Sequence, residues 1–160
     1  LETFKPIGTI IDFGCGTGRA GVKFVEAGND VLLIDFTDNC RDDEALEIPF
    51  MKWDLTETCS ASSGFGYCPA VIEHIPTGDV KTVVDNIMLA SEKVFFQIST
   101  VDDLFSELVD FGTNLHLTVK PHLWWEYLFA SSGYKVEWSE EQGIASLFYV
   151  INPDRRELCQ

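Results

Sequence analysis

Short apolar runs alternate with stretches of helical spacing along most of this chain of 160 residues. A short continuous apolar run is typical of a strand that is buried on both faces, as in a parallel sheet. The pattern predicts seven strands, at Thr9–Phe13, Val31–Ile34, Pro49–Trp53, Phe65–Cys68, Lys93–Ile98, Tyr134–Trp138 and Ala145–Ile151.

Apolar residues with helical spacing lie between most of these strands. Asp79–Ala90 is the clearest helix, because its valines, Ile87 and Met88 fall on one face. The pattern also predicts helices at Gly18–Ala27, from Val101 to a stop at Gly112, and from Pro121 to about Ser132, with weaker helical spacing at Asp38–Leu46. Polar composition indicates a loop at Cys59–Gly64 and an acidic connection at Ser139–Gly143.

The order of these elements predicts the fold class. Strands that alternate with helices favour a parallel sheet with both faces covered. The last two strands have no helix between them, so we expect them to pair antiparallel. We therefore predict a single α/β domain over residues 1–153, a doubly wound, mostly parallel seven-stranded sheet with a C-terminal antiparallel hairpin, followed by a tail at residues 154–160.

Three alternating glycines follow the first predicted strand, at Gly14, Gly16 and Gly18, with Asp12 just before them. Glycine has no Cβ, so a ligand can approach the backbone closely, and positive φ angles are tolerated. The turn also places backbone N–H groups at the positive end of the following helix. This combination predicts a binding site for a nucleotide-type cofactor.

Two frames of the glycine turn suggest different cofactors. Residues 16–21 match the G-x-G-x-x-G pattern of dinucleotide sites, with Asp35 at about the required distance. In that frame, however, the first glycine lies three residues past Phe13, where the strand ends. The frame that begins at Asp12 and places Gly14 at the turn fits the strand end better, and an NAD-dependent oxidoreductase remains the alternative.

In this second frame, residues 12–18 resemble the first motif of the class I S-adenosylmethionine-dependent methyltransferases. Three further segments resemble family motifs in the same order, Val31–Asp35, Met51–Leu55 and Val71–Pro76, the last being similar to the V-L-E-H-I-P stretch of small-molecule members. The resemblance covers about residues 9–151. It implies a Rossmann-like fold, S-adenosylmethionine as the cofactor, and methyl transfer to a small-molecule acceptor.

The resemblance also implies which residues bind the cofactor. Asp35 would hold the ribose hydroxyls, because a carboxylate accepts two hydrogen bonds, and Asp54 would lie near the adenine amino group. A plain helix cap at Asp35 and a plain turn at Asp54 are the alternatives. The cofactor-binding set is Asp12, Gly14, Cys15, Gly16, Gly18, Asp35, Phe36, Asp54 and Leu55, although Cys15 and Cys68 also suit a role as small buried fillers.

The catalytic candidates are His116, His74 and Glu73. His116 lies between the fifth strand and the next helix, where ligands bind in α/β sheets, and an imidazole is a natural proton acceptor at neutral pH. The resemblance places Glu73 and His74 beside the methionine end of the cofactor. No metal site is expected, because the three histidines, with His122 as the third, are scattered in the sequence.

Two departures from the family pattern bear on function. Ala70 stands where the family usually has an aspartate before V-L-E-H-I-P. Only eight residues precede Thr9, where most members carry helices that roof the active site. We expect that the roof is absent, was removed, or is supplied by an oligomer or a partner. A non-catalytic cofactor-binding module of a larger assembly is therefore a further alternative.

Composition narrows the possible partners. The chain has 26 acidic and 11 basic residues, a formal net charge of -15 and no basic run, so we expect no binding to nucleic acid. No apolar run approaches the ~20 residues that a membrane helix needs, so no membrane association is expected. Five cysteines without a C-x-x-C pattern argue against disulfides and structural zinc and favour the cytoplasm.

Overall fold

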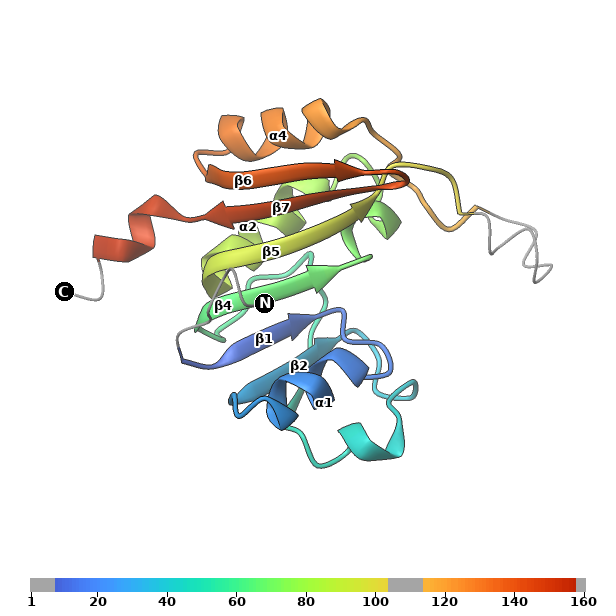
Figure 1. Ribbon diagram of the computed structural model, residues 1–160, viewed down its shortest axis with the longest axis vertical. Coiled ribbons are helices and arrows are strands. Elements are labelled where there is room, and N and C mark those ends of the chain that lie inside the picture. The colour runs from blue at the N-terminus through green and yellow to red at the C-terminus, as the bar shows by residue number, and fades with distance from the viewer. Residues whose placement is uncertain (1–7, 104–113, 158–160) are drawn as a thin grey trace.

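The computed structural model describes residues 8–103 and 114–157. Within this part of the chain, seven strands form one sheet in the order β3-β2-β1-β4-β5-β7-β6 (Figure 1). Strands β1 to β5 pair in parallel, whereas β7 pairs antiparallel with both β5 and β6. The predicted fold class is confirmed, including the antiparallel hairpin at the C-terminal end.

The strands lie close to the positions that the apolar runs predict. Their bounds are β1 (Ile10–Phe13), β2 (Val31–Asp35), β3 (Phe50–Lys52), β4 (Ser63–Pro69), β5 (Ser91–Ser99), β6 (Lys135–Gln142) and β7 (Ala145–Ile151). Strand β1 is buried along its whole length, as expected for a central parallel strand.

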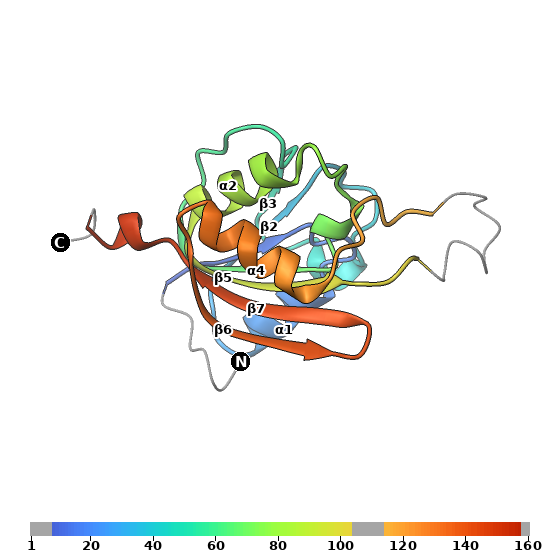
Figure 2. The same cartoon turned by 90° about the horizontal axis from the view of Figure 1, so that it is seen from above.

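Helices cover both faces of the sheet, as the alternation of elements predicts. Helix α1 (Arg19–Glu26) lies on one face, and α2 (Val80–Ala90) and α4 (His122–Ser131) lie on the other (Figure 2). Each face has its own core: Phe24 of α1 packs with Leu33 and Phe65, while Ile87 and Trp125 belong to the larger cluster on the opposite face. None of the helices in the described ranges is long and apolar enough to cross a membrane.

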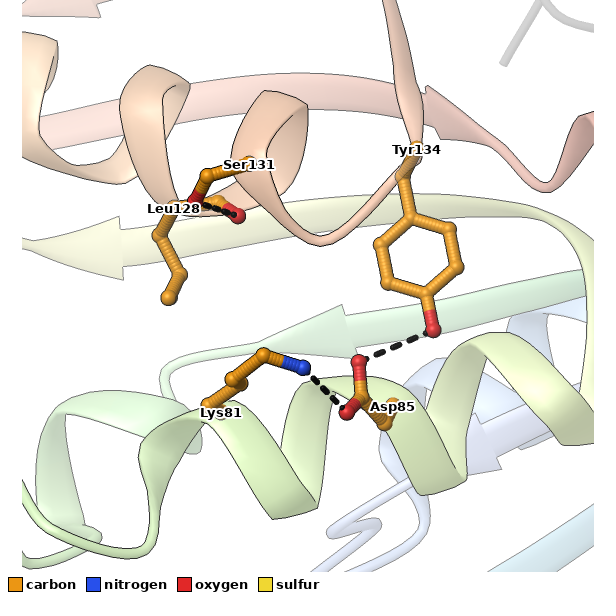
Figure 3. A network of polar contacts seen from close by, with 5 residues as sticks. All are labelled: Lys81, Asp85, Leu128, Ser131 and Tyr134. Atoms are coloured by element: carbon orange, nitrogen blue, oxygen red, sulfur yellow. Dashed lines mark hydrogen bonds and ion pairs between the residues drawn. The ribbon is translucent and has the colours of Figure 1, made fainter.

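A polar link ties α2 to the turn between α4 and β6. The Tyr134 hydroxyl donates a hydrogen bond to Asp85 Oδ1 at 3.0 Å, and Lys81 pairs with Asp85 Oδ2 at 2.7 Å (Figure 3). Burial and the Asp85 carboxylate raise the pKa of Tyr134, so its hydroxyl stays protonated and keeps donating. The bond fixes the position of α4 relative to α2 on the same face.

The expectation of an acidic connection at Ser139–Gly143 is wrong. Strand β6 continues through Glu140 and Glu141 to Gln142, so only Gly143 and Ile144 join it to β7. β6 is at the sheet edge and pairs with β7 alone, so its charged side chains reach solvent without breaking the ladder. Gly143 has φ +60°, as tight hairpin turns require.

Other differences are smaller. The weak helical pattern at Asp38–Leu46 yields only a short 3-10 turn, η1 (Asp43–Ala45). Strand β4 begins at Ser63, within the predicted loop. Where a tail was expected, Pro153–Glu157 form a 3-10 helix, η3. The helix expected from Val101 to Gly112 lies mainly outside the described residues, and residues 101–103 are not helical.

Candidate functional site

The candidate residues gather at the carboxyl ends of the parallel strands, which is where ligands bind in open α/β sheets. A cleft of about 690 Å³ opens there, within the usual size range of small-molecule sites. Its lining comes from Gly14, Asp35, Phe36, Trp53, Asp54, Leu55, Ala70, Val71, His74, Ile75, Asn114, Leu115 and Leu117. A second hollow of about 530 Å³ beside α1 and β2 contains none of the predicted site residues.

The three glycines of the turn all have positive φ angles, but their surroundings differ. A Cβ on Gly14 would lie 2.5 Å from Val71 Cγ2, so Gly14 is required for close packing against the turn after β4. A Cβ on Gly16 would meet nothing within 4 Å of protein. The space beside Gly16 is therefore open, as a backbone that receives a ligand requires.

Asp35 joins the end of β2 to the glycine turn. Its Oδ2 accepts a hydrogen bond of 2.9 Å from the N–H of Gly16, and its Oδ1 accepts one of 3.2 Å from the N–H of Thr37. The side chain is buried, yet it also lines the cleft. Asp35 therefore holds the turn that follows β2 and also lines the cleft, but it does not cap a helix, because the next helical element is the 3-10 turn at Asp43–Ala45.

Asp12, near the end of β1, and Cys15, within the glycine turn, do not line the cleft. Asp12 is almost fully buried, its Oδ2 has no hydrogen-bond partner in the described structure, and burial raises the pKa of its carboxyl to about 7, aided by the nearby charge of Asp35. A hydrogen bond from the Gly21 N–H acts in the opposite direction. Burial also raises the pKa of the Cys15 thiol to about 12, so the half-buried Cys15 is not a thiolate nucleophile at neutral pH.

The side chains after β2 and β3 form one wall of the cleft. Phe36 is 73% exposed although it is large and apolar, so a ligand in the cleft can cover it. Asp54 accepts hydrogen bonds from the Thr56 backbone N–H at 2.9 Å and hydroxyl at 2.8 Å, and these bonds lower its pKa. Asp54 thus makes a local turn and lines the cleft beside Leu55.

The turn after β4 carries the unusual residue Ala70. It is the single residue other than glycine with positive φ, 52°, in the described ranges, and its N–H donates to the Gln97 carbonyl at 2.8 Å. A left-handed conformation costs alanine about 1–2 kcal/mol, so the surrounding structure holds this turn. The 3-10 turn η2 (Ile72–His74) follows directly and positions Glu73 and His74.

The three catalytic candidates lie together, although His116 comes more than forty residues after Glu73 and His74 in the sequence. The rings of His74 and His116 meet edge to face, with centroids 4.9 Å apart. Glu73 is buried beneath them, and its Oε1 accepts a hydrogen bond of 3.0 Å from the Ser99 N–H. His74 lines the cleft, so the cluster borders it.

Sequence reasoning missed part of the cleft. Trp53, Val71, Ile75, Asn114, Leu115 and Leu117 all line it, and none was singled out as a site residue. Trp53, Val71 and Ile75 lie within the family-like segments, and the other three lie within two residues of His116, so position after a strand end was the available signal. His122 lies elsewhere, on α4, hydrogen-bonded to Ser146 and Ser139.

Comparisons with known proteins identify the fold. No family model and no curated protein matches the sequence. An O-methyltransferase family protein from Burkholderia thailandensis matches with a TM-score of 0.71 at 12% identity, covering 91% of this chain and 51% of that one. Magnesium protoporphyrin IX methyltransferase from Synechocystis PCC 6803, with bound SAH, matches with a TM-score of 0.72 at 14% identity, and the match covers 92% of this chain and 74% of that one. A structure described as a pericyclic reaction enzyme matches with a TM-score of 0.67 at 14% identity, and the match covers 92% of this chain and 43% of that one.

These likenesses establish the fold, which is the one that the resemblance to class I S-adenosylmethionine-dependent methyltransferases implies. The chain spans about half the length of the first of these proteins and about three quarters of the second. One fold serves different reactions, so the function has to be argued from the site.

Proposed function

We propose that this chain is an S-adenosylmethionine-dependent methyltransferase that acts on a small-molecule acceptor. The observation that carries the proposal is the carboxylate of Asp35, which is held by the Gly16 N–H and lines a cleft of about 690 Å³. The solved neighbours named as methyltransferases support it, because they share this fold.

The residues present fit this cofactor. Asp35 would accept hydrogen bonds from the ribose hydroxyls, since a carboxylate oxygen can accept more than one. The open space beside Gly16 admits a ligand close to the backbone, and the exposed ring of Phe36 gives the adenine an apolar surface. Asp54 and Leu55 lie on the same wall and Gly14 also lines the cleft, whereas Asp12, Cys15 and Gly18 belong to the strand end and turn without lining it.

The cluster of Glu73, His74 and His116 would form the acceptor end of the site. The methyl group of S-adenosylmethionine is already activated on a sulfonium, so the protein has mainly to align and desolvate the two reactants. A hydroxyl or protonated amine acceptor also has to lose a proton. His116 is our first candidate for that base, followed by His74 and Glu73.

Two alternatives are less well supported. An NAD-dependent oxidoreductase of the classic dinucleotide fold has the parallel strand order 3-2-1-4-5-6, whereas here the antiparallel β7 lies between β5 and β6. A non-catalytic cofactor-binding module would share the fold, and Ala70 in place of the usual aspartate favours it modestly. Turnover of any methyl acceptor separates a module from an enzyme.

We also propose a setting for this activity. The cysteines in the described ranges, Cys15, Cys40, Cys59 and Cys68, are free thiols, which suits the cytoplasm. The acidic composition supports a small molecule rather than nucleic acid as the substrate. An oligomer or a partner that roofs the cleft stays part of the proposal.

Isothermal titration calorimetry tests the cofactor directly. S-Adenosylmethionine and its demethylated product should both bind with one site per chain, and NAD should bind much more weakly. Tighter binding of NAD than of S-adenosylmethionine would overturn the proposed function.

A further inference from the structure

Two segments about forty residues apart are clamped together beside the cleft. The Thr118 N–H donates to the Glu73 carbonyl at 2.9 Å, and the Thr118 hydroxyl donates to the Ile75 carbonyl at 2.7 Å. The hydroxyls of Thr77 and Thr118 are 2.9 Å apart. These hydrogen bonds of Thr118, which we call the clamp, hold the two backbone segments next to each other. The fold itself therefore brings Glu73, His74 and His116 together.

Backbone carbonyls orient both imidazole rings. Nδ1 of His74 lies 3.0 Å from the Leu115 carbonyl, and Nδ1 of His116 lies 2.7 Å from the Val101 carbonyl. A carbonyl only accepts hydrogen bonds, so the proton of each neutral ring sits on Nδ1 and the lone pair on Nε2. Histidines that bind metals are held in this way, with the other ring nitrogen donating to a carbonyl or carboxylate.

The carboxylate of Glu73 completes the group. Its side chain is 1% exposed, and Oε2 has no hydrogen-bond partner within the described residues. Burying a carboxylate oxygen without a partner costs free energy, and a bound cation or a proton removes that cost. One ligand atom from each of Glu73, His74 and His116 lies within 4.8 Å of the other two.

We propose that Glu73, His74 and His116 bind one divalent transition-metal ion. Two imidazoles and one carboxylate suit Zn²⁺, Co²⁺, Mn²⁺ or Fe²⁺, whereas Mg²⁺ and Ca²⁺ prefer oxygen ligands alone. Bonds of about 2.0–2.2 Å place the ligand atoms of a tetrahedral ion about 3.4 Å apart, so the side chains need to close by only ~1.5 Å. No metal site is expected from the sequence, because the histidines are scattered along the chain. The fold nevertheless brings His74 and His116 together with Glu73.

The role of this ion rests on the proposed function. Three protein ligands leave at least one coordination position open, and His74 lines the cleft. An acceptor oxygen bound at that position loses its proton to water more readily, because the cation stabilises the anion. Its lone pair then forms the O–CH₃ bond as the S–CH₃ bond of the cofactor breaks, and the sulfur keeps that electron pair. The ion uses the His116 lone pair, so His116 is then a ligand and not a base.

Cobalt titration of chelator-treated, tag-free protein tests the site. Wild type should bind one Co²⁺ per chain, with visible ligand-field absorption, and Zn²⁺ should displace it. His74→Ala and His116→Ala should each lower the affinity ~100-fold or more, and Glu73→Gln at least ~10-fold. The matched control is His122→Ala, which removes the third histidine and should retain the affinity of wild type.

Several results would overturn the metal site. They are a wild-type protein without saturable Co²⁺ binding, an unchanged affinity in both His74→Ala and His116→Ala, or an equal loss in His122→Ala. Circular dichroism establishes that each variant is folded. His74 is exposed, so His74→Ala should fold even if Glu73→Gln does not.

The metal and the cofactor are tested separately. A protein that binds S-adenosylmethionine but not Co²⁺ overturns the metal site alone, and one that binds Co²⁺ but not S-adenosylmethionine overturns the proposed function alone. Catechol, used as an oxygen-donor probe, should change the Co²⁺ absorption of wild type. An unchanged spectrum at saturating catechol would overturn the role of the ion in binding an acceptor oxygen.

Discussion

The Asp35 carboxylate and the Gly16 N–H are 2.9 Å apart, and this bond joins the end of β2 to the glycine turn after β1. The two neighbouring strand ends are thereby held as one unit. The same carboxylate accepts a hydrogen bond from the Thr37 N–H. Asp35 therefore has a structural role in the free protein, in addition to the cofactor role that we propose.

Substitution of Asp35 should affect both roles. Asp35→Ala removes the proposed ribose contact and should weaken S-adenosylmethionine binding by about 1–3 kcal/mol, the usual loss for a charge-assisted hydrogen bond. It also leaves the N–H groups of Gly16 and Thr37 without this acceptor, so the free energy of unfolding should fall. Calorimetry and urea denaturation measure the two effects, with the exposed Asp38→Asn as control. Unchanged cofactor affinity in a folded variant would show that Asp35 has only the structural role.

Two glycines of the turn should respond differently to alanine. Both have positive φ, 67° at Gly14 and 51° at Gly16, which costs alanine about 1–2 kcal/mol. At Gly14 the new Cβ also meets Val71 at 2.5 Å, and such overpacking costs about 1–3 kcal/mol more. Gly14→Ala should thus lower the urea midpoint more than Gly16→Ala.

The Gly16→Ala protein should instead lose cofactor affinity, because its Cβ occupies the open space that we assign to the ligand. Each variant is the control for the other, since both add one methyl group in the left-handed region. The reverse order, with Gly16→Ala the less stable protein and full cofactor affinity, would contradict the assignment.

Hydrophobic patterning alone predicted the sheet, because the buried parallel strands contain continuous apolar runs such as Val31–Ile34 in β2. It failed for the end of β6, where Glu140 and Glu141 have the composition of a loop. An edge strand needs hydrogen bonds on one side only, and its side chains can stay in water. Composition therefore does not distinguish such a strand from an acidic turn.

The site was predicted unevenly for a similar reason. Asp35 is the last residue of β2 and Asp54 comes two residues after β3, so the strand ends locate both on the cleft. The contact between His74 and His116 depends on hydrogen bonds from Thr118 to Glu73 and Ile75. No local pattern encodes a clamp between segments forty residues apart, so the sequence offered these histidines as separate candidates.

His116 should matter for turnover and not for cofactor binding. His116→Ala should lower the rate of methyl transfer ~100-fold or more, whether the side chain acts as a base or as a metal ligand. S-Adenosylmethionine affinity should stay near that of wild type, because His116 does not line the cleft. Both quantities are measured on one variant, with His122→Ala as the matched control. Retained turnover with reduced cofactor affinity would place His116 in the cofactor pocket.

The last prediction concerns pH and Asp12. Burial raises the pKa of this carboxyl from 3.8 to about 7 in the folded chain. Between these pH values the folded chain keeps a proton that the unfolded chain has released, so its stability falls as the pH rises through this window. The protonated Asp12 carboxyl contributes its full share of the free energy of unfolding below about pH 4, and this share is lost as the pH passes about 7. It amounts to at most roughly 4 kcal/mol.

Asp12→Asn should remove this dependence, because the amide stays neutral and its oxygen can still accept the Gly21 N–H. The free energy of unfolding of the variant, relative to wild type, should therefore be higher at about pH 8 than at about pH 4.5. Urea denaturation of the cofactor-free proteins at both pH values measures the difference. Asp30→Asn, at an exposed aspartate, should show no such change and serves as the control. If the free energies of unfolding of wild type and Asp12→Asn changed equally between the two pH values, Asp12 would be ionised in the folded chain across this range. A cation or a hydrogen-bond donor would then have to contact its Oδ2.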